Sequence, residues 1–192
     1  MRLLNSTIHS DLSPQNIDCP SFSRFTRKAA RAIVLQHDNI LLLYTERYQD
    51  YSLPGGGIDE GESQVDGLVR ELREETGAQN PRNFRFFGVY EEYRPWYKND
   101  FDMVHMLSYC YQCDIDKTLL APQLESYEKS NGMRPVWMNI FDAIAHNEST
   151  IAASDKKGLS IERETFLLKK IAEELMPCLY KVTHCIAKKP VS

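Results

Sequence analysis

The sequence has little cysteine, no long apolar run and no excess of basic residues. Its five cysteines form an odd set that is too sparse for a disulfide scaffold, which fits a reducing compartment. No apolar run approaches the roughly 18 residues of a membrane-spanning helix. The segment MRLLNSTIHSDLSPQNIDCP also lacks the longer apolar core of a signal peptide. We therefore expect a cytoplasmic protein with no membrane partner.

The charge balance is slightly acidic, with 23 Lys and Arg residues against 27 Asp and Glu residues and a formal net charge of −4. Binding nucleic acid through a broad surface requires an excess of positive charge to neutralise phosphates. The composition therefore argues against a nucleic-acid partner but is compatible with a small phosphorylated ligand. The chain has 192 residues, of which 42% are hydrophobic, and this is enough for one well-buried core.

Three parts are expected along the chain. Residues 1–24 carry Pro, Ser, Asn and Asp without periodicity and indicate an irregular N-terminal arm. Residues 25–176 indicate one domain. Its last segment, 160–176, repeats apolar residues at near-helical spacing and predicts an amphipathic helix that ends before Pro177. Residues 177–192 have no strong period and indicate a tail.

Several runs rich in β-branched and aromatic residues predict strands. KAARAIVLQ and ILLLYTE flank the turn HDN and indicate a hairpin, and residues 84–92 and 103–115 indicate two strands joined by a loop over 93–102. RPVWMNI indicates a short strand and FDAIAHNE a short helix after it. Cys110 and Cys113 match C-x-x-C, but a spacing of three places the two thiols on opposite faces of a strand, so we interpret them as ordinary strand residues.

The stretch GGIDEGESQVDGLVRELREETGA, residues 56–78, contains seven acidic side chains and two arginines. Ser63 followed by Asp66 resembles a capping box, and Gly77 suits the left-handed position after a helix end, so a helix is expected over about 64–76. At about 100° per residue, one arc of this helix is apolar and a separate arc carries carboxylates. The apolar arc contains Val65, Leu68, Val69 and Leu72, and the acidic arc contains Glu71, Glu74 and Glu75.

Three carboxylates on one patch repel each other, and two neighbouring arginines compensate little of that repulsion. Hard divalent cations such as Mg²⁺ prefer oxygen ligands, and they complete their shell with water and substrate phosphate. The alternative is a solvated helix face, but Glu62, Arg70 and the LPGGG turn converge on the same end and favour a metal site. Gly67, one turn before Glu71, leaves room for substrate or for the preceding loop, or allows close packing on a strand.

This arrangement resembles the Nudix hydrolase signature, which reads Gly, five residues, Glu, seven residues, Arg-Glu, a bulky aliphatic, any residue, Glu-Glu, any residue, Gly and an aliphatic. The matching residues are Gly56, Glu62, Arg70, Glu71, Leu72, Glu74, Glu75 and Gly77. Ala78 departs from the pattern, because Val, Leu or Ile is usual there. The resemblance implies an α/β fold, namely an α/β/α sandwich with a mixed β-sheet, in which the signature supplies a loop, a helix and a loop.

The resemblance further implies hydrolysis of a phosphoanhydride bond in a nucleoside diphosphate linked to another group, with Mg²⁺ or Mn²⁺ as the cofactor. Glu71 is implied as a metal ligand or as the general base, and Arg70 as the residue that holds the glutamates in place. Glu62 would brace the loop or join the metal shell. The implied metal ligands are the carbonyl of Gly55 or Gly56, together with Glu62, Glu71, Glu74 and Glu75.

The substrate is expected to be selected outside the signature. The segment YRPWYKNDFD, residues 93–102, offers aromatic rings that stack on a base and cations that contact phosphate. The candidate substrate-binding residues are Arg47, Tyr93, Arg94 and Trp96, and Arg31 is a further cation on the first strand. The alternatives are a packed loop or a dimer interface for 93–102, and a surface salt bridge for Arg31 and Arg47. A canonical nucleotide, an oxidised nucleotide and ADP-ribose all stay open as substrates.

Three alternatives accompany this hypothesis. The general base could come from Glu125 or Glu128, whose alternative is a solvated loop position, and His105 is interpreted as a packed strand residue rather than a base. The chain could be a catalytically inactive module that senses a nucleotide or a sugar, although such modules usually have a degenerate signature. Finally, the C-terminal helix and the aromatic loop could serve a homodimer or an adaptor, although docking of that helix on the domain core is simpler.

Overall fold

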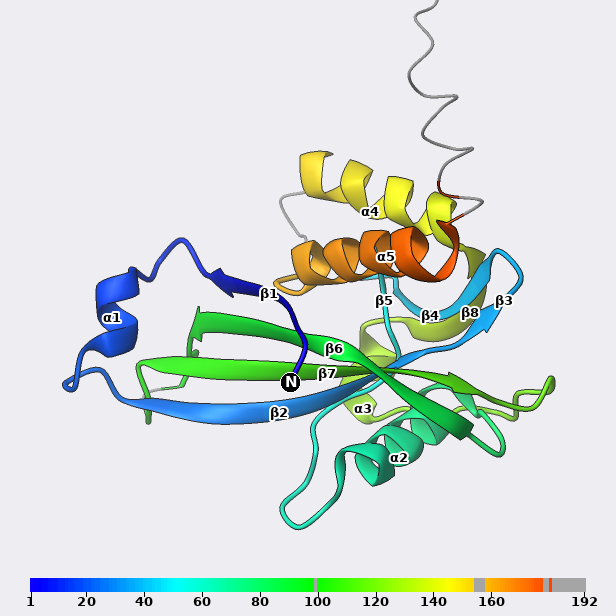
Figure 1. Cartoon of the computed structure of the whole chain (residues 1–192), viewed down its shortest axis with the longest axis horizontal. Helices are drawn as coiled ribbons and strands as arrows, with labels where there is room; N and C mark the ends of the chain where they lie inside the picture. Colours follow the sequence, from blue (N-terminus) through cyan, green and yellow to red (C-terminus); the bar gives the residue numbers. More distant parts are fainter. Residues whose placement is uncertain (99, 154–157, 178–179, 181–192) are drawn as a thin grey trace, which may run out of the picture. The chain divides into compact units, whose positions relative to one another are not determined.

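The computed structural model describes residues 1–98, 100–153, 158–177 and 180 (Figure 1). They form two compact units, Met1–Ile33 with Pro54–Ala121, and Val34–Leu53 with Pro122–Ser192. Across the described residues, every helix is too short or too polar to span a bilayer. Apart from 177 and 180, the expected tail lies outside the described part of the chain.

The first unit is built on a mixed four-stranded sheet (Figure 1). Its strand order is β1 (Leu3–Ile8), β6 (Arg82–Pro95), β7 (Met103–Asp114) and β2 (Arg24–Ile33). The two central strands, β6 and β7, form an antiparallel hairpin, and each outer strand pairs with its neighbour in parallel. The sheet therefore joins segments that are far apart in the sequence.

Helix α2 (Gln64–Thr76) lies on one face of this sheet, as predicted from its caps and its apolar arc. Ser63 accepts a hydrogen bond from the backbone N–H of Asp66, and Gly77 ends the helix in the left-handed conformation with φ of 71°. Leu68 and Leu72 are fully buried, which confirms the apolar arc.

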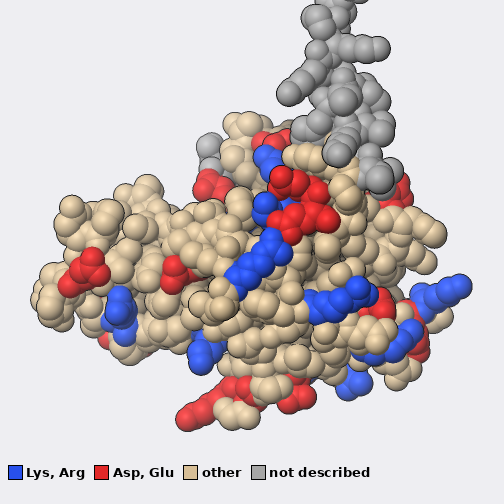
Figure 2. Space-filling model, viewed as in Figure 1, with Lys and Arg blue, Asp and Glu red and all other residues tan. Residues whose placement is uncertain are grey.

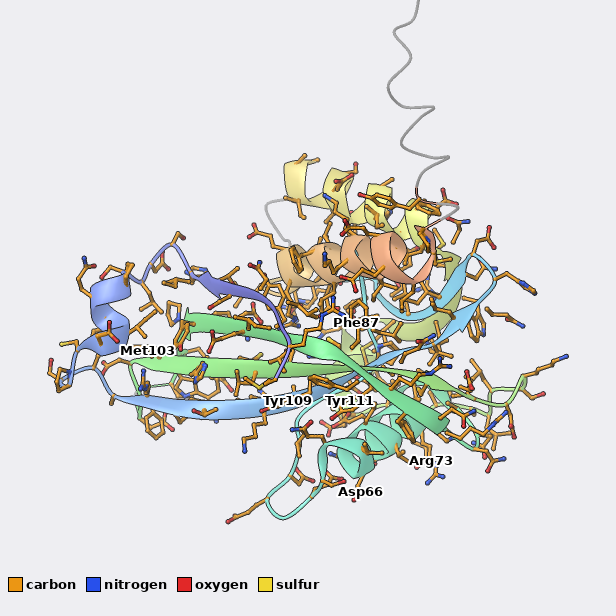
Figure 3. All side chains as sticks on the ribbon, in the orientation of Figure 1. Asp66, Arg73, Phe87, Met103, Tyr109 and Tyr111 are labelled. Atoms are coloured by element: carbon orange, nitrogen blue, oxygen red, sulfur yellow. The ribbon has the colours of Figure 1, made fainter. Side chains whose placement is uncertain are left out.

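The orientation of α2 on the sheet can be followed in Figure 3. Tyr109 and Tyr111 lie on the side of β7 that faces α2, and the hydroxyl of Tyr111 donates to Oε1 of Gln64 at 2.6 Å. Asp66 and Arg73 lie on the side of α2 that is turned away from the sheet. The helix is therefore fixed to the sheet by its first turn as well as by its leucines.

The second unit is built on antiparallel strands and three helices. The strands are β3 (Leu35–Gln36), β4 (Asn39–Thr45), β5 (Asp50–Ser52) and β8 (Met133–Asn139), with β4 pairing the other three. The helices are α3 (Ser126–Ser130), α4 (Ile140–Ala153) and α5 (Ile161–Leu175). Helix α5 confirms the expected C-terminal helix, and α4 continues well past the segment FDAIAHNE.

The predicted hairpin of the first two apolar runs is wrong in most of its length. Strand β2 pairs with β7, and only Leu35 and Gln36, forming β3, turn back on β4. The apolar run contributes to two sheets. Its first part belongs to β2 and pairs with a strand about 80 positions further along the chain, and its last two residues form β3. Local turn chemistry gave no sign of that distant partner.

Residues 1–24 are not irregular throughout, contrary to expectation. They contain β1 and the short helix α1 (Pro14–Asp18), and β1 adds an outer strand to the sheet by pairing with β6. Apolar and polar residues alternate only weakly in its sequence, LLNSTI, because an edge strand is only partly buried. The division of the chain into arm, domain and tail stays a prediction.

The loop expected over 93–102 is shorter than predicted. Strands β6 and β7 continue as a ladder through Tyr93↔His105, Arg94↔Val104 and Pro95↔Met103. Tyr93 and Arg94 are therefore strand residues, and Trp96 begins the connection. The expected α/β class with a mixed sheet is confirmed.

Candidate active site

The glycine-rich turn before α2 is held along the free edge of β2. The backbone N–H of Ala30 donates to the carbonyl of Gly56 at 3.0 Å, and that of Ala32 donates to the carbonyl of Pro54 at 2.8 Å. Gly55 has φ of 129°, and a Cβ there would overlap the carbonyl oxygen of Ala30. The turn can lie this close to β2 only because position 55 is glycine.

Arg70 is the centre of the charged network on α2. Its guanidinium donates to both carboxylate oxygens of Glu62, at 3.1 and 3.0 Å, and to Oε1 of Glu71 at 2.8 Å. It also donates to Glu74 at 3.4 Å and to the carbonyl of Gly57 at 2.9 Å. The hydrogen bonds that Arg70 donates to Glu62 are the main cause that raises the pKa of Arg70, and the same contacts lower the pKa of Glu62. The expectation that Arg70 holds the glutamates in place therefore agrees with its contacts.

The carboxylate of Glu71 lies directly against the turn. A Cβ atom at position 56 would come within 2.5 Å of Cδ of Glu71, so the absence of a side chain at Gly56 makes room for this carboxylate. The Glu71 side chain is 16% exposed. Burial raises the pKa of Glu71, and the nearby guanidinium of Arg70 opposes that rise. Glu71 is therefore a stronger base than an exposed glutamate.

Glu75 and Glu74 differ in their surroundings. Oε2 of Glu75 accepts a hydrogen bond from the backbone N–H of Gly55 at 2.6 Å, and the residue is 7% exposed. The Glu74 side chain is 46% exposed and points to the Arg70 guanidinium. The structure thus brings Glu71 and Glu75 to the turn 55–57, whereas the contact given for Glu74 is with Arg70.

Gly67 serves the loop that precedes the helix. A Cβ there would lie 2.9 Å from Oε2 of Glu62 and 3.5 Å from a side-chain carbon of Ile58. Of the interpretations left open by the sequence, room for the preceding loop is the one that the contacts favour. The glycine lets Glu62 approach α2 closely enough to bind Arg70.

The donor set at the turn fits a hard divalent cation. Within the described residues, no three His, Cys, Asp or Glu side chains converge in metal-binding geometry, and Arg70 is the positive charge among the acids. All candidate donors are nevertheless carboxylate or carbonyl oxygens, which Mg²⁺ and Mn²⁺ prefer. The empty side-chain position at Gly56 also keeps the Glu71 carboxylate next to the backbone of the turn.

Two of the candidate substrate residues, Tyr93 and Arg94, do not share a face of the sheet. Tyr93 and Arg94 are consecutive in β6, so their side chains lie on opposite faces of the sheet. Tyr93 stacks on His105 with ring centroids 4.5 Å apart, while Nη2 of Arg94 contacts Sδ of Met106 at 3.4 Å. A ligand on one face therefore reaches at most one of Tyr93 and Arg94.

Trp96 and Arg47 each have contacts within their own unit. Trp96 packs edge-on against Phe25 with ring centroids 4.7 Å apart. Phe25 lies five residues before Ala30 in β2, which is about 16 Å of strand. Arg47 belongs to the second unit, where its Nη1 donates to Oδ1 of Asn131 at 3.1 Å.

The other acid-base candidates have partners of their own. Glu128 is 7% exposed in α3, where it accepts hydrogen bonds from the Glu125 backbone at 2.7 Å and the Tyr127 hydroxyl at 3.1 Å. Glu125 is exposed, and both glutamates belong to the second unit. His105 is a strand residue whose Nε2 lies 2.7 Å from Oε1 of Glu91.

The two strand cysteines are structural. Cys110 and Cys113 carry thiols rather than a disulfide and are buried in β7, as expected for ordinary strand residues. Burial raises the pKa of the Cys113 thiol to about 12, so this thiol is not ionised near neutral pH.

Two features of the sheet were missed by sequence reasoning. A polar row runs across it, in which Ser6 donates to Oε2 of Glu91 at 2.7 Å and Glu91 also contacts His105. The second is Arg31, whose Nη1 donates to the carbonyl of Gly55 instead of forming a surface salt bridge. Both features depend on the register between neighbouring strands, and no local pattern of residues reveals that register.

Charged side chains of both signs are interspersed on the face shown in Figure 2. Among the described residues drawn there, acidic and basic groups alternate over short distances, and no broad basic area forms. The charge pattern on this face is therefore mixed, in keeping with the net charge of −4.

Comparison with known proteins places these features in a wider group. The model of the NUDIX domain matches residues 25–159. The chain is 35% identical over 81 residues to an RNA pyrophosphohydrolase from Ruthia magnifica subsp. Calyptogena magnifica, covering 41% of this chain and 43% of that protein. It is 30% identical over 112 residues to the diphosphoinositol polyphosphate phosphohydrolase NUDT4B from Homo sapiens, covering 57% of this chain and 54% of that protein. The aligned part thus spans about half the length of these relatives.

A solved structure gives a match of the fold. The NUDIX hydrolase from Nitrosomonas europaea aligns with a TM-score of 0.50 and 19% identity, covering 71% of this chain and 95% of that one. At this level of identity the likeness concerns the fold alone.

Proposed function

The chain belongs to the NUDIX family, as the signature over 56–78 predicts, and from this premise we propose that it is a metal-dependent pyrophosphohydrolase. The bond to be cleaved is a phosphoanhydride in a nucleoside diphosphate linked to another group. The observation that carries the proposal is the network around Arg70, in which one guanidinium serves several carboxylates at a glycine turn. An excess of negative charge at such a turn suits a site where a cation and phosphate meet.

We propose that Mg²⁺ or Mn²⁺ is held by the glutamates of α2, with Glu62 as a further ligand. When bound, the ion would neutralise negative charge on the phosphate and lower the pKa of a coordinated water. The carbonyls of Gly55 and Gly56 accept hydrogen bonds from Arg31 and Ala30, but each carbonyl oxygen has a second lone pair available. The proposed side-chain ligands are Glu62, Glu71, Glu74 and Glu75.

The chain's own residues would divide the work of hydrolysis. Glu71, with its raised pKa, is suited to take a proton from the attacking water, provided that it is ionised at the working pH. Arg70 positions Glu62 and Glu71 through charge-assisted hydrogen bonds rather than touching the reacting atoms. The backbone N–H of Gly55 holds Glu75 in a single orientation.

The substrate class is proposed more broadly than the sequence suggested. A canonical nucleotide, an oxidised nucleotide and ADP-ribose remain candidates, and Tyr93, Arg94, Trp96 and Arg47 remain proposed contacts. The matched relatives are named for RNA and for diphosphoinositol polyphosphate, so both belong in the test panel. An RNA substrate would require only its terminal phosphoanhydride to reach the acids, which is compatible with a mixed surface charge.

The deciding experiment measures hydrolysis of this panel with and without Mg²⁺, using the full chain and the Glu75→Gln variant. We expect metal-dependent turnover of one class and a loss of at least about a hundredfold in the variant, because Glu75 would lose a charged oxygen at the site. Glu148→Gln is the matched control, since the Glu148 side chain is 51% exposed and forms a surface ion pair with Lys169 at 2.6 Å. Turnover of Glu75→Gln close to wild type would contradict the proposal.

The same experiment separates the other interpretations. Binding of a panel compound without any turnover would favour a sensing module, although the acids and the arginine of the signature are all present. A homodimer is tested separately by light scattering, which gives the molar mass in solution.

A further inference from the structure

Helix α2 covers only part of the sheet face on which it lies. Tyr109 is buried on the side of β7 that faces α2, and it is paired with the buried Ala30 of β2 (Figure 3). Side chains alternate between the two faces of a strand, so residues two and four positions earlier in β7 lie on this same face. These residues are Leu107 and His105, and both are partly exposed. The face is therefore open beyond Tyr109.

The register of the sheet places two rows of side chains on this open face. The nearer row contains Lys28, Leu107, Glu91 and Ser6, and the farther row contains Thr26, His105, Tyr93 and Ile8. At about 3.3 Å per residue, the two rows lie about 7 and 13 Å from Ala30 along the strand direction. The N–H of Ala30 donates to the carbonyl of Gly56, where a Cβ would meet the Glu71 carboxylate. The open face therefore begins beside the glycine turn and extends away from it.

Hydrogen bonds hold a carboxylate in place on the nearer row. Oε1 of Glu91 lies 2.7 Å from Nε2 of His105 and accepts from the Tyr93 hydroxyl at 3.3 Å. Oε2 accepts from Ser6 at 2.7 Å, which is its one hydrogen bond within the described residues. A carboxylate oxygen has two lone pairs, and the Glu91 side chain is 22% exposed. Oε2 is therefore oriented and able to accept a further hydrogen bond from a ligand.

The farther row offers a ring on which an aromatic base can stack. The rings of Tyr93 and His105 lie parallel, with 3° between their planes and centroids 4.5 Å apart. Strands β6 and β2 flank β7, so Tyr93 covers the imidazole from one side and Thr26 lies on the other. Thr26 is short and exposed, with its hydroxyl 3.4 Å from Nδ1 of His105. A planar base can therefore continue the stack above Thr26.

A cation lies between this stack and the glycine turn. Lys28 is exposed and lies two positions from Thr26 and two from Ala30, on the same face as both. Within the part of the chain that the structure describes, its side chain forms no ion pair. An ammonium group in this place is available to a phosphate that links a base on His105 to the acids of α2.

We propose that this open face binds the nucleoside end of the substrate. The base stacks on His105, Glu91 accepts a hydrogen bond from the nucleoside, and Lys28 contacts the adjoining phosphate. The inference rests on the proposed hydrolase function and assigns the choice of substrate to residues outside the signature. Between Tyr93 and Arg94, which lie on opposite faces, it selects Tyr93 as the second ring of the stack. A phosphoanhydride without a base would gain only the contact with Lys28, so the face favours nucleotides.

Nucleoside 5′-monophosphates are the probes of this face, because they carry a base, a ribose and one phosphate but no phosphoanhydride. Calorimetric titration of the full chain in EDTA with AMP, GMP, CMP and UMP measures affinity independently of turnover. For the tightest probe, we expect losses of about threefold to tenfold in Lys28→Gln and at least about tenfold in His105→Leu. Lys117→Gln is the matched control for Lys28→Gln, because Lys117 is an exposed lysine beyond the opposite end of β7.

His105→Phe separates stacking from a merely structural role of the imidazole. A phenyl ring keeps the stack but removes the contacts of the imidazole with Glu91 and Thr26, so its affinity should stay within about threefold of wild type. Equal losses in the two His105 variants, or no loss in either, would overturn the proposal. Lys28 is exposed, so Lys28→Gln should fold normally. If neither His105 variant folds, unchanged affinity in Lys28→Gln overturns the proposal.

The two proposals can fail separately. Nucleotide binding that depends on His105 and Lys28, without hydrolysis of any panel compound by the wild type, would leave the nucleoside site standing and reject the hydrolase. Metal-dependent hydrolysis together with nucleotide affinities that ignore both substitutions would reject the nucleoside site alone. A wild-type chain that binds none of the four probes would also reject that site.

Discussion

Each of the two units holds a cluster of acidic residues around one arginine, and the two clusters differ in access to solvent. In the first unit, the Arg70 side chain is 30% exposed and is shared among several carboxylates. In the second unit, Arg163 and Glu164 pair at 2.7 Å with side chains that are 4% and 0% exposed. Glu164 also accepts a hydrogen bond from the backbone of Leu53 at 3.0 Å, and Asp50, 4% exposed, lies near it.

The difference shows how a protein deals with an excess of negative charge. In the buried cluster, desolvation first and the charge of Glu164 second raise the pKa of Asp50 to about 6, so Asp50 keeps its proton to a higher pH than an exposed aspartate does. In the exposed cluster, contacts with Arg70 lower the pKa of Glu62, so that carboxylate stays ionised. The sealed acids of the second unit serve the fold, whereas the partly exposed acids around Arg70 are available to a ligand.

The largest effect that would test this comparison is expected from Glu164→Gln. The substitution leaves Arg163 buried without the charge of Glu164, and breaking a buried ion pair in this way costs about 3–5 kcal/mol of unfolding free energy. Glu74→Gln is the matched change in the exposed cluster and should alter stability by less than about 0.5 kcal/mol. Urea unfolding of both variants measures this, and equal losses would break the comparison.

Next in size is the effect of a methyl group at the turn. Gly56→Ala places a Cβ within 2.7 Å of the Glu71 carboxylate and forces it to move, so we expect turnover to fall by about a hundredfold. Gly57→Ala adds the same methyl group, but its Cβ would meet only the guanidinium of Arg27 at 3.6 Å. Steady-state kinetics should show a much smaller loss for Gly57→Ala. Similar losses in the two variants would mean that crowding of Glu71 is not the cause.

The smallest expected effect is the pH dependence of stability that Asp50 causes in the buried cluster. Because folding raises the pKa of Asp50 from its ordinary 3.8 to about 6, its stabilising contribution is present below 3.8 and is lost as the pH rises through 6. Asp50→Asn should therefore be more stable than wild type at pH 8, by about 2 kcal/mol. The gap should close toward pH 4 in thermal unfolding experiments. A gap that does not change with pH would show that Asp50 titrates normally.

Local patterns in the sequence predicted much of the helix that carries the acids. The cap at Ser63, the left-handed Gly77 and the apolar arc of α2 are all features of neighbouring residues, and all three are confirmed. The C-terminal helix was predicted for the same reason, whereas the α/β class was predicted from the resemblance of the signature to the Nudix family. The roles of the glutamates in metal binding and catalysis stay predictions, because they depend on a ligand rather than on the fold.

Features that depend on pairing between distant segments were not predicted. The partner of β2 is a strand about 80 positions later, and the apolar run KAARAIVLQ fits a hairpin just as well as this parallel pair. The placement of Arg31 beside Gly55 depends on the register between β2 and the turn, which hydrogen bonds of the backbone determine. The same holds for the pairing of Glu91 with His105 across β6 and β7.

The parallel pairing of β1 with β6 has a consequence for the order of events during synthesis. Strand β1 is made before its partner, the segment around Glu91, which follows some 85 residues later. Closing so long a loop is slow compared with forming the β6–β7 hairpin, whose strands are neighbours in the chain. Until β1 docks, one edge of β6 presents unpaired backbone groups. A newly made chain is therefore most exposed to pairing with another copy of itself during this interval, and removal of β1 would make that exposure permanent.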